Sequence, residues 1–222
     1  MSLNVKDCGF DLPEGVDKSM IKESIENYSG ISYKDKTCLD LGANVGGFVY
    51  VATEGGAKLV KAFEPDARNF ALLEKNTGMM DNVELFKGCI SDNRDIQATV
   101  FKSKSKNSHC SSRIYNGNKR FPEFCKCDNY HLADVINSFD KLDVLKIDIE
   151  GYEEFLFRDF DCYEAILQAD ELFVEFHLKV KNKDFLLNIV EELKVHYEVS
   201  NIKEMIFYKE VRGLDCYFKR KK

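Results

Sequence analysis

The chain has 222 residues, of which 44% are apolar and 32% charged, a composition that fits one globular domain with a sizeable core. Its formal net charge of −6 argues against a protein that wraps nucleic acid, because phosphate binding needs a dominant basic face. No apolar run reaches the roughly 18–20 residues that span a bilayer, and the first residues lack a signal-peptide pattern, so we expect a soluble, cytoplasmic protein.

The first half of the chain alternates between strand and helix patterns. The expected strands are 36–42, 57–65 and 82–92, and the expected helices are 17–29, 45–56 and 66–78. Asp66 is a plausible N-cap for the last of these helices. Alternation with such short links is typical of a parallel sheet with crossover helices, so the sequence predicts an α/β fold.

The second half resumes the same pattern after an interruption. The expected segments are a strand and helix over 123–139, a strand over 141–151, broken helix over 152–168, a strand over 171–177, a helix over 182–193, and closing strands at 196–202, 204–210 and 215–222. We expect the closing strands to form an antiparallel end. Polar residues collect where the expected strands end, and in open α/β sheets that edge binds ligands.

The interruption, residues 93–122, is polar and basic, and a loop of this length is usually functional or disordered. We expect a single domain over 1–222, with an N-terminal helical extension over 1–30 and an insertion over 93–130. One hypothesis makes the insertion a substrate lid, in which Tyr115 stacks on a sugar and Arg113 binds an anionic group. A solvated loop and a contact with nucleic-acid phosphates are the alternatives.

The stretch CLDLGANVGGF, residues 38–48, forms a glycine-rich turn after the first strand. A phosphate-binding loop would carry Lys and then Ser or Thr after its last glycine, where this chain has Phe48 and Val49. A dinucleotide fingerprint would carry glycine where this chain has Asn44. Neither phosphate-binding pattern fits well.

The turn suits S-adenosylmethionine better. Asp40 can offset the cationic ammonium and sulfonium of that molecule, and Gly42 and Gly46 let the backbone pass close to it. Glu64, about 20 residues after Gly42, can accept hydrogen bonds from both ribose hydroxyls.

Asn44 completes the predicted cofactor-binding turn, and two residues after the third strand are expected to reach the adenine. Ser91 and Asp92 stand where that strand ends, although a turn or helix-cap role explains an aspartate there almost equally well.

Four segments together resemble the FkbM family of S-adenosylmethionine-dependent methyltransferases: CLDLGANVGGF, AFEPDARNFALLEKN, NVELFKGCISD and LDVLKIDIEGYEEFLF. The phrase VEFH also fits, and the resemblance covers residues 37–178. It implies a class I, Rossmann-like methyltransferase fold: a doubly wound, mostly parallel seven-stranded sheet with an antiparallel C-terminal strand. It also implies O-methylation, most often of a sugar hydroxyl on a glycan, glycolipid or glycosylated small molecule.

The candidate catalytic residues alternate along two expected strands, Lys146 and Asp148 on one, Glu175 and His177 on the other. If these strands are neighbours, their polar groups converge beside the reacting methyl group. A histidine or a carboxylate can then take the proton of the acceptor hydroxyl. Alternatively, Asp148, Glu175 and His177 hold Mg²⁺ or Mn²⁺. Lys146 and Glu150 could instead form a structural ion pair.

Other acceptors remain open. The DIEG tip disfavours methylation of a base amine, but Lys146 and Asp148 also fit the Lys-Asp-Lys-Glu set of RNA ribose 2′-O-methylation. Another small molecule is possible too, whereas a binding module without catalysis would have a degraded cofactor turn. We expect a glycan or other hydroxyl-bearing substrate rather than nucleic acid. The oligomeric state, a dimer included, is left open.

Overall fold

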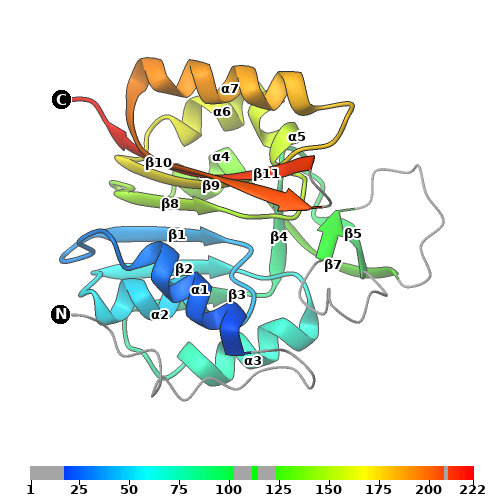
Figure 1. Cartoon of the computed structure of the whole chain (residues 1–222). Helices are drawn as coiled ribbons and strands as arrows, with labels where there is room; N and C mark the ends of the chain where they lie inside the picture. The colour runs from blue at the N-terminus through cyan, green and yellow to red at the C-terminus, as the bar shows by residue number, and fades with distance from the viewer. Residues whose placement is uncertain (1–17, 103–111, 115–123, 208–209) are drawn as a thin grey trace.

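The computed structural model describes residues 18–102, 112–114, 124–207 and 210–222. Within them a seven-stranded sheet forms the middle of the molecule (Figure 1). Its strands are, in spatial order, β10 (Tyr197–Phe207), β11 (Glu210–Arg220), β9 (Glu171–His177), β8 (Val144–Ile147), β1 (Thr37–Leu41), β2 (Leu59–Phe63) and β3 (Val83–Phe86).

Helices cover both faces of this sheet, as Figure 1 shows. One face carries α1 (Lys18–Tyr28), α2 (Gly47–Glu54) and α3 (Ala67–Thr77); the other carries α4 (Leu132–Ile136), α5 (Glu153–Arg158), α6 (Phe160–Ile166) and α7 (Lys183–His196). Each face buries its own apolar cluster, with Phe48 and Leu73 in the first and Leu156 and Leu193 in the second. Among the described helices, none is long and apolar enough to cross a membrane.

The central strands run parallel. β1 pairs with β2 on one side and with β8 on the other, and β8 pairs with β9. The chain order therefore changes direction between β1 and β8, which makes their carboxyl ends a topological switch point where a crevice opens. The expected doubly wound, mostly parallel sheet is confirmed.

The closing strands differ in number from the prediction. Residues 197–202 and 204–207 of the first two candidates lie in the single strand β10. The third strand, β11, begins at Glu210 and ends at Arg220, whereas the prediction placed it at 215–222. β11 is antiparallel to both β10 and β9, so the antiparallel end is confirmed.

The predicted strand 82–92 is wrong as one unit, because it forms two strands of different sheets. β3 completes the large sheet, whereas β4 (Gly88–Ser91) pairs with β7 (Phe124–His131) in a second sheet. The other strands of this sheet are β5 (Gln97–Lys102) and β6 (Ser112–Ile114). A Cβ on Gly88 would lie 2.8 Å from the carbonyl oxygen of Asp128, so glycine allows strands β4 and β7 to approach each other at this point.

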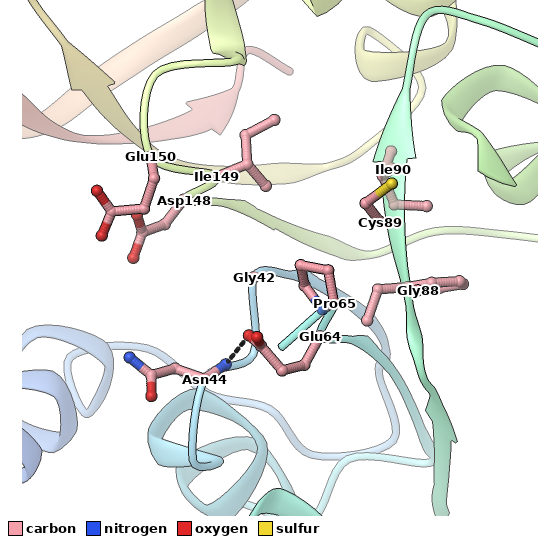
Figure 2. Close-up of a pocket in the computed structure, with 11 residues that line it drawn as sticks. Gly42, Asn44, Glu64, Pro65, Gly88, Cys89, Ile90, Asp148, Ile149 and Glu150 are labelled. Atoms are coloured by element: carbon pink, nitrogen blue, oxygen red, sulfur yellow. Dashed lines mark hydrogen bonds between the residues drawn. The ribbon is translucent and has the colours of Figure 1, made fainter. Parts of the chain in front are cut away.

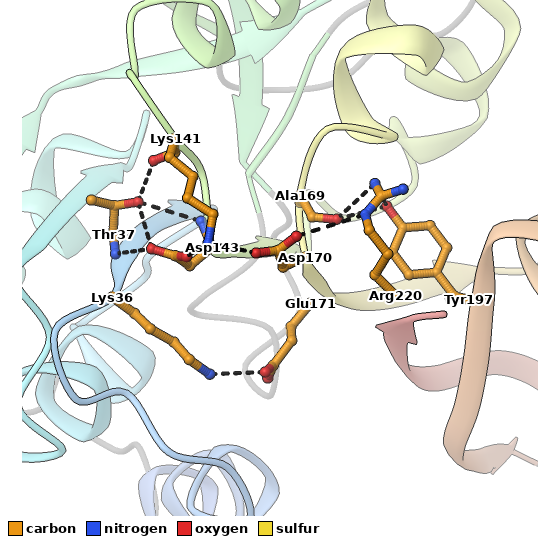
Figure 3. Close-up of polar contacts among 9 residues, drawn as sticks. All are labelled: Lys36, Thr37, Lys141, Asp143, Ala169, Asp170, Glu171, Tyr197 and Arg220. Carbon is orange, nitrogen blue, oxygen red and sulfur yellow. Dashed lines mark hydrogen bonds and ion pairs between the residues drawn. The ribbon is translucent and has the colours of Figure 1, made fainter. Parts of the chain in front are cut away.

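Polar contacts close the amino-terminal edge of the large sheet (Figure 3). Lys36 donates to Glu171 at 2.8 Å, and the backbone N–H of Thr37 donates to Asp143 at 2.8 Å. Arg220 donates to the carbonyl oxygen of Ala169 at 3.0 Å and to the hydroxyl of Tyr197. These contacts tie β1, β8, β9 and β11 together at the edge opposite the switch point.

Replacing Gly42 by Ala should destabilise the protein by roughly 3 kcal/mol or more. Gly42 has φ +81°, and a Cβ there would overlap the carbonyl oxygen of Asp148 at the tip of β8. Urea unfolding measures the change. Gly30→Ala is the matched control, because nothing lies within 4 Å of its Cβ position. Equal stability of the two variants would contradict this explanation.

Candidate active site

A pocket of about 550 Å³, partly open to solvent, lies at the switch point. We call it the glycine-turn pocket; its lining residues are Gly42, Asn44, Phe63, Glu64, Pro65, Gly88, Cys89, Ile90, Asp148, Ile149 and Glu150. Figure 2 shows Asp148 and Glu150 at one end and Cys89 and Ile90 at the other. The pocket is therefore acidic at one end and apolar at the other, with Glu64 between them.

Every second residue of the turn between β1 and α2 has a left-handed conformation. The φ angles are 81° at Gly42, 53° at Asn44 and 104° at Gly46. Asparagine tolerates this conformation better than most residues, which explains why it can replace a glycine here. Gly42 is needed for the close approach of the carbonyl oxygen of Asp148, so the fold itself requires glycine at this position.

Glu64 is 4% exposed and reaches the pocket from the end of β2. Its carboxylate accepts the backbone N–H of Asn44 at 2.9 Å and that of Asp66 at 2.8 Å. Burial raises the pKa of Glu64 to about 8, although these two hydrogen bonds oppose the rise. Asp66 also caps α3 by accepting the N–H of Arg68 at 2.8 Å, as expected. The two backbone N–H groups fix the position of the Glu64 carboxyl group, which can accept hydroxyl donors on its pocket side.

Asp40 and Lys146 lie beneath the turn. Asp40 is fully buried, and Lys146 is 4% exposed, with its Nζ 3.0 Å from Asp40 Oδ1. The same ammonium donates to the carbonyl oxygen of Gly42 at 2.7 Å and lies 3.7 Å from Asp148. Burial favours a neutral lysine, but Asp40 and Asp148 outweigh it and raise the pKa of Lys146. The charge of Asp40 is thus offset within the protein, and the partner of Lys146 is Asp40 rather than Glu150.

Three of the predicted catalytic side chains do converge. Asp148, Glu175 and His177 place ligand-type atoms within 4.8 Å of one another. Burial, and then the charge of Asp148, raise the pKa of Glu175 to about 8. The adjacency of β8 and β9 brings these groups together, as the alternation along the strands predicted.

His177 lies inside a set of carboxylates. Its Nδ1 is 3.1 Å from Glu153, and its Nε2 is 3.3 Å from Glu175 and 3.5 Å from Glu150. Burial alone would lower the pKa of His177, but these acidic neighbours, Glu153 first, raise it to about 10. This pKa favours the cationic imidazole, in which each ring nitrogen carries a proton and faces a carboxylate.

Glu153 is a site residue whose role the sequence did not reveal. It is fully buried at the start of α5, where its negative charge also favours the helix N-terminus. Its carboxylate accepts the N–H of Ile149 at 3.2 Å and that of Gly151 at 3.0 Å, besides the contact with His177. Glu153 thus fixes the tip of β8 to the end of β9. Its position two residues after the glycine of DIEG was the available signal.

The predicted adenine contacts lie just past the pocket. Ser91 is 2% exposed and bonds to Asn93, and Asp92 accepts the hydroxyl of Tyr152 at 2.7 Å. The pocket is lined instead by Cys89 and Ile90, from the same strand β4. Their apolar side chains were missed because the sequence favoured polar contacts.

The predicted substrate residues fall at or beyond the margin of the described structure. Arg113 lies in β6, the outer strand of the second sheet. Tyr115 lies outside the described residues.

A sequence profile of the methyltransferase FkbM domain matches residues 40–213. No curated protein matches the chain.

Three solved structures resemble the fold. An rRNA methylase from Streptococcus thermophilus is 10% identical with a TM-score of 0.54, and covers 90% of this chain and 95% of its own. A Listeria monocytogenes protein assigned as an S-adenosylmethionine-dependent methyltransferase is 11% identical, covers 93% and 100%, and has a TM-score of 0.54. A Streptococcus mutans protein assigned as a methyltransferase, in complex with SAH, is 12% identical, covers 90% and 97%, and has a TM-score of 0.54.

Fold, glycine turn and switch-point pocket together define a class I methyltransferase architecture. Because the domain profile spans most of its length, the chain belongs to the FkbM family of S-adenosylmethionine-dependent methyltransferases. The resemblance seen in the sequence is confirmed.

Replacing Glu64 by Gln should weaken binding of S-adenosylhomocysteine by about 10- to 100-fold, because the amide NH2 of glutamine cannot accept a backbone N–H or a ribose hydroxyl as a carboxyl oxygen of Glu64 can. Isothermal titration calorimetry measures the affinity. Glu74→Gln, on the exposed side of α3, is the control and should bind as wild type does. Unchanged affinity in Glu64→Gln would show that the ribose is held elsewhere.

Replacing Glu153 by Gln should lower the pKa of His177 from about 10, since Glu153 is its strongest acidic neighbour. Nitrogen-15 NMR of labelled histidine gives the pKa directly, and wild-type His177 should remain protonated at pH 8. A wild-type His177 that titrates near its ordinary value of 6.5 would contradict the carboxylate set described above.

Proposed function

We propose that the chain transfers a methyl group from S-adenosylmethionine to a hydroxyl of a sugar carried by a glycan, a glycolipid or a glycosylated small molecule. One observation carries the proposal: two neighbouring carboxylates stand between two pockets. Asp148 lines the glycine-turn pocket, and Glu175 lines a second pocket on the α1 face of the sheet. A donor and a hydroxyl acceptor bound on either side would meet at these carboxylates.

The two ends of the glycine-turn pocket differ in polarity, which favours one orientation of a bound methyl donor. Cys89 and Ile90 form an apolar end that suits an adenine ring, and Glu64 stands where ribose hydroxyls would follow. Asp148 and Glu150 give the far end a negative charge that favours a cationic methionine moiety. The cationic centre would then lie nearest the carboxylate pair.

The chemistry needs little beyond placement and proton removal. Bound S-adenosylmethionine supplies a methyl group already activated by its sulfonium. The protein must hold the acceptor hydroxyl in line and accept its proton. We assign that proton to Glu175 or Asp148, because both ring nitrogens of His177 already face carboxylates. His177 then acts as the cation that holds Glu175 in place.

A divalent cation is the alternative device. Asp148, Glu175 and His177 offer two oxygen ligands and one nitrogen at suitable mutual distances, a set that fits Mn²⁺ better than Mg²⁺. For this to occur, His177 would have to exchange a carboxylate partner for the metal. Loss of activity with EDTA and its return with Mn²⁺ would support this version, and full activity in EDTA would remove it.

RNA ribose 2′-O-methylation is the second candidate function, because an rRNA methylase shares the fold and Lys146 and Asp148 are present. The ammonium of Lys146 is buried, however, and is already engaged by Asp40 and by the carbonyl oxygen of Gly42, which disfavours its use on a ribose hydroxyl. The net charge of −6 also disfavours RNA.

The test is transfer of a labelled methyl group from S-adenosylmethionine to a panel of acceptors. The panel holds glycans, rhamnose- and fucose-type glycosides and glycosylated small molecules, with RNA alongside. We expect label in at least one sugar and none in RNA. Label in RNA alone would replace the proposal with the second candidate.

Glu175→Gln and Asp148→Asn should each lower kcat by about 10²- to 10⁴-fold if the carboxylates place the hydroxyl and take its proton. Glu175→Gln should bind S-adenosylhomocysteine normally, since Glu175 lies outside the lining of the glycine-turn pocket. Glu164→Gln, exposed on α6, serves as the control. A wild-type kcat in both Glu175→Gln and Asp148→Asn would show that these carboxylates neither place the hydroxyl nor take its proton.

A further inference from the structure

A second pocket, of about 490 Å³, opens on the face of the sheet that carries α1. We call it the α1 pocket; its lining residues are Asn27, Tyr28, Lys146, Ile147, Phe173, Val174, Glu175, Asn201, Lys203, Asp215, Cys216 and Tyr217. The floor comes from β8, β9, β11 and β10, and one wall comes from the end of α1.

The strand register orders the floor into two rows. Glu175 pairs with Asp215, which pairs in turn with Lys203, and this gives a polar row across β9, β11 and β10. Residues two apart on a strand share a face, so the next pairs give a row beside it. That second row is Phe173, Tyr217 and Asn201.

The second row has an aromatic surface. Phe173 and Tyr217 stack with ring centroids 4.5 Å apart, and Tyr28 of α1 meets Phe173 edge-on at 5.3 Å. Tyr217 is held further by its hydroxyl, which donates to Glu171 at 2.8 Å. A fixed aromatic surface beside a row of polar groups suits a ring with one apolar face and a rim of hydroxyls.

We propose that the α1 pocket is the acceptor site and that it selects a neutral monosaccharide unit, with Asp215 as a specificity-determining residue. The inference rests on the proposed function. The sugar ring lies over Tyr217, and its hydroxyls bond to Asp215 and Asn201. One hydroxyl reaches Glu175, whose carboxylate neighbours Asp148 of the glycine-turn pocket.

The charges of the pocket account for the selection of a neutral unit. Glu175 and Asp215 face the pocket, and the two lysines among its lining residues are both paired: Lys203 with Glu23 at 2.8 Å and Lys146 with Asp40 at 3.0 Å. A phosphate or carboxylate placed in the pocket would lie beside the carboxylates of both Glu175 and Asp215 and be repelled by them, which costs affinity. Neutral hydroxyls can donate to these carboxylates.

The test measures sugar binding without requiring turnover. Saturation-transfer NMR is recorded with S-adenosylhomocysteine present, using the methyl glycosides of rhamnose, fucose and galactose, with methyl glucuronide and glucose 6-phosphate as anionic probes. At least one neutral glycoside should bind wild type, and the anionic probes should bind at least about tenfold more weakly.

Asp215→Asn should weaken binding of the neutral glycoside by about tenfold. It should also reduce the ratio between the affinity for the neutral glycoside and the affinity for the anionic probes. Asn201→Ala should also weaken binding of the neutral glycoside. Because Asn201 is exposed, this second variant tests the pocket even if Asp215→Asn does not fold. Glu204→Gln is the control, because Glu204 neighbours Lys203 on β10 and points to the opposite face. Affinity for S-adenosylhomocysteine should be unchanged in all three.

The outcomes separate the two proposals. If a sugar is methylated but Asp215→Asn and Asn201→Ala both keep the wild-type KM, the α1 pocket is not the acceptor site and the proposed function stands. Equal binding of neutral and anionic probes also overturns the inference alone. If no sugar binds or is methylated while RNA is labelled, both fall.

Discussion

The site depends on one interaction, the buried ion pair between the ammonium of Lys146 and the carboxylate of Asp40. The ammonium joins the tips of β1 and β8 by contacting Asp40, the carbonyl oxygen of Gly42 and Asp148. Such a buried charge is costly to desolvate, and removing one partner would leave the other uncompensated. The two strand ends therefore stay together, and Gly42 and Asp148 at these ends both line the glycine-turn pocket. Gly42 permits the approach because it has no Cβ.

A second buried charge pair extends this order to β9. Glu153 holds the backbone after β8 and contacts His177 at the end of β9, and His177 in turn contacts Glu175. Asp148 and Glu175 are consequently presented side by side on a fixed support. Placement by a rigid surrounding is what a methyl transfer to a hydroxyl requires, since the remaining tasks are orientation and removal of one proton.

The sequence predicted those features that depend on local pattern. The parallel strands, the cap at Asp66 and the convergence of Asp148 with Glu175 follow from periodicity and from the rule that strand ends share an edge. The sequence could not identify Asp40 as the ion-pair partner of Lys146, because nothing in it shows that β1 and β8 are neighbours. Asp215 was missed for a similar reason: only the antiparallel register of β11 places it beside Glu175. The break within 82–92 has no local signal apart from one glycine.

The central claim is that the two pockets meet at Asp148 and Glu175. A crystal structure of the protein with S-adenosylhomocysteine tests it most directly. We predict adenine beside Cys89 and Ile90, ribose hydroxyls on Glu64, and a sulfur atom that faces the carboxylate pair and the α1 pocket beyond it. A sulfur directed toward the second sheet, with the α1 pocket closed off from it, would contradict the claim.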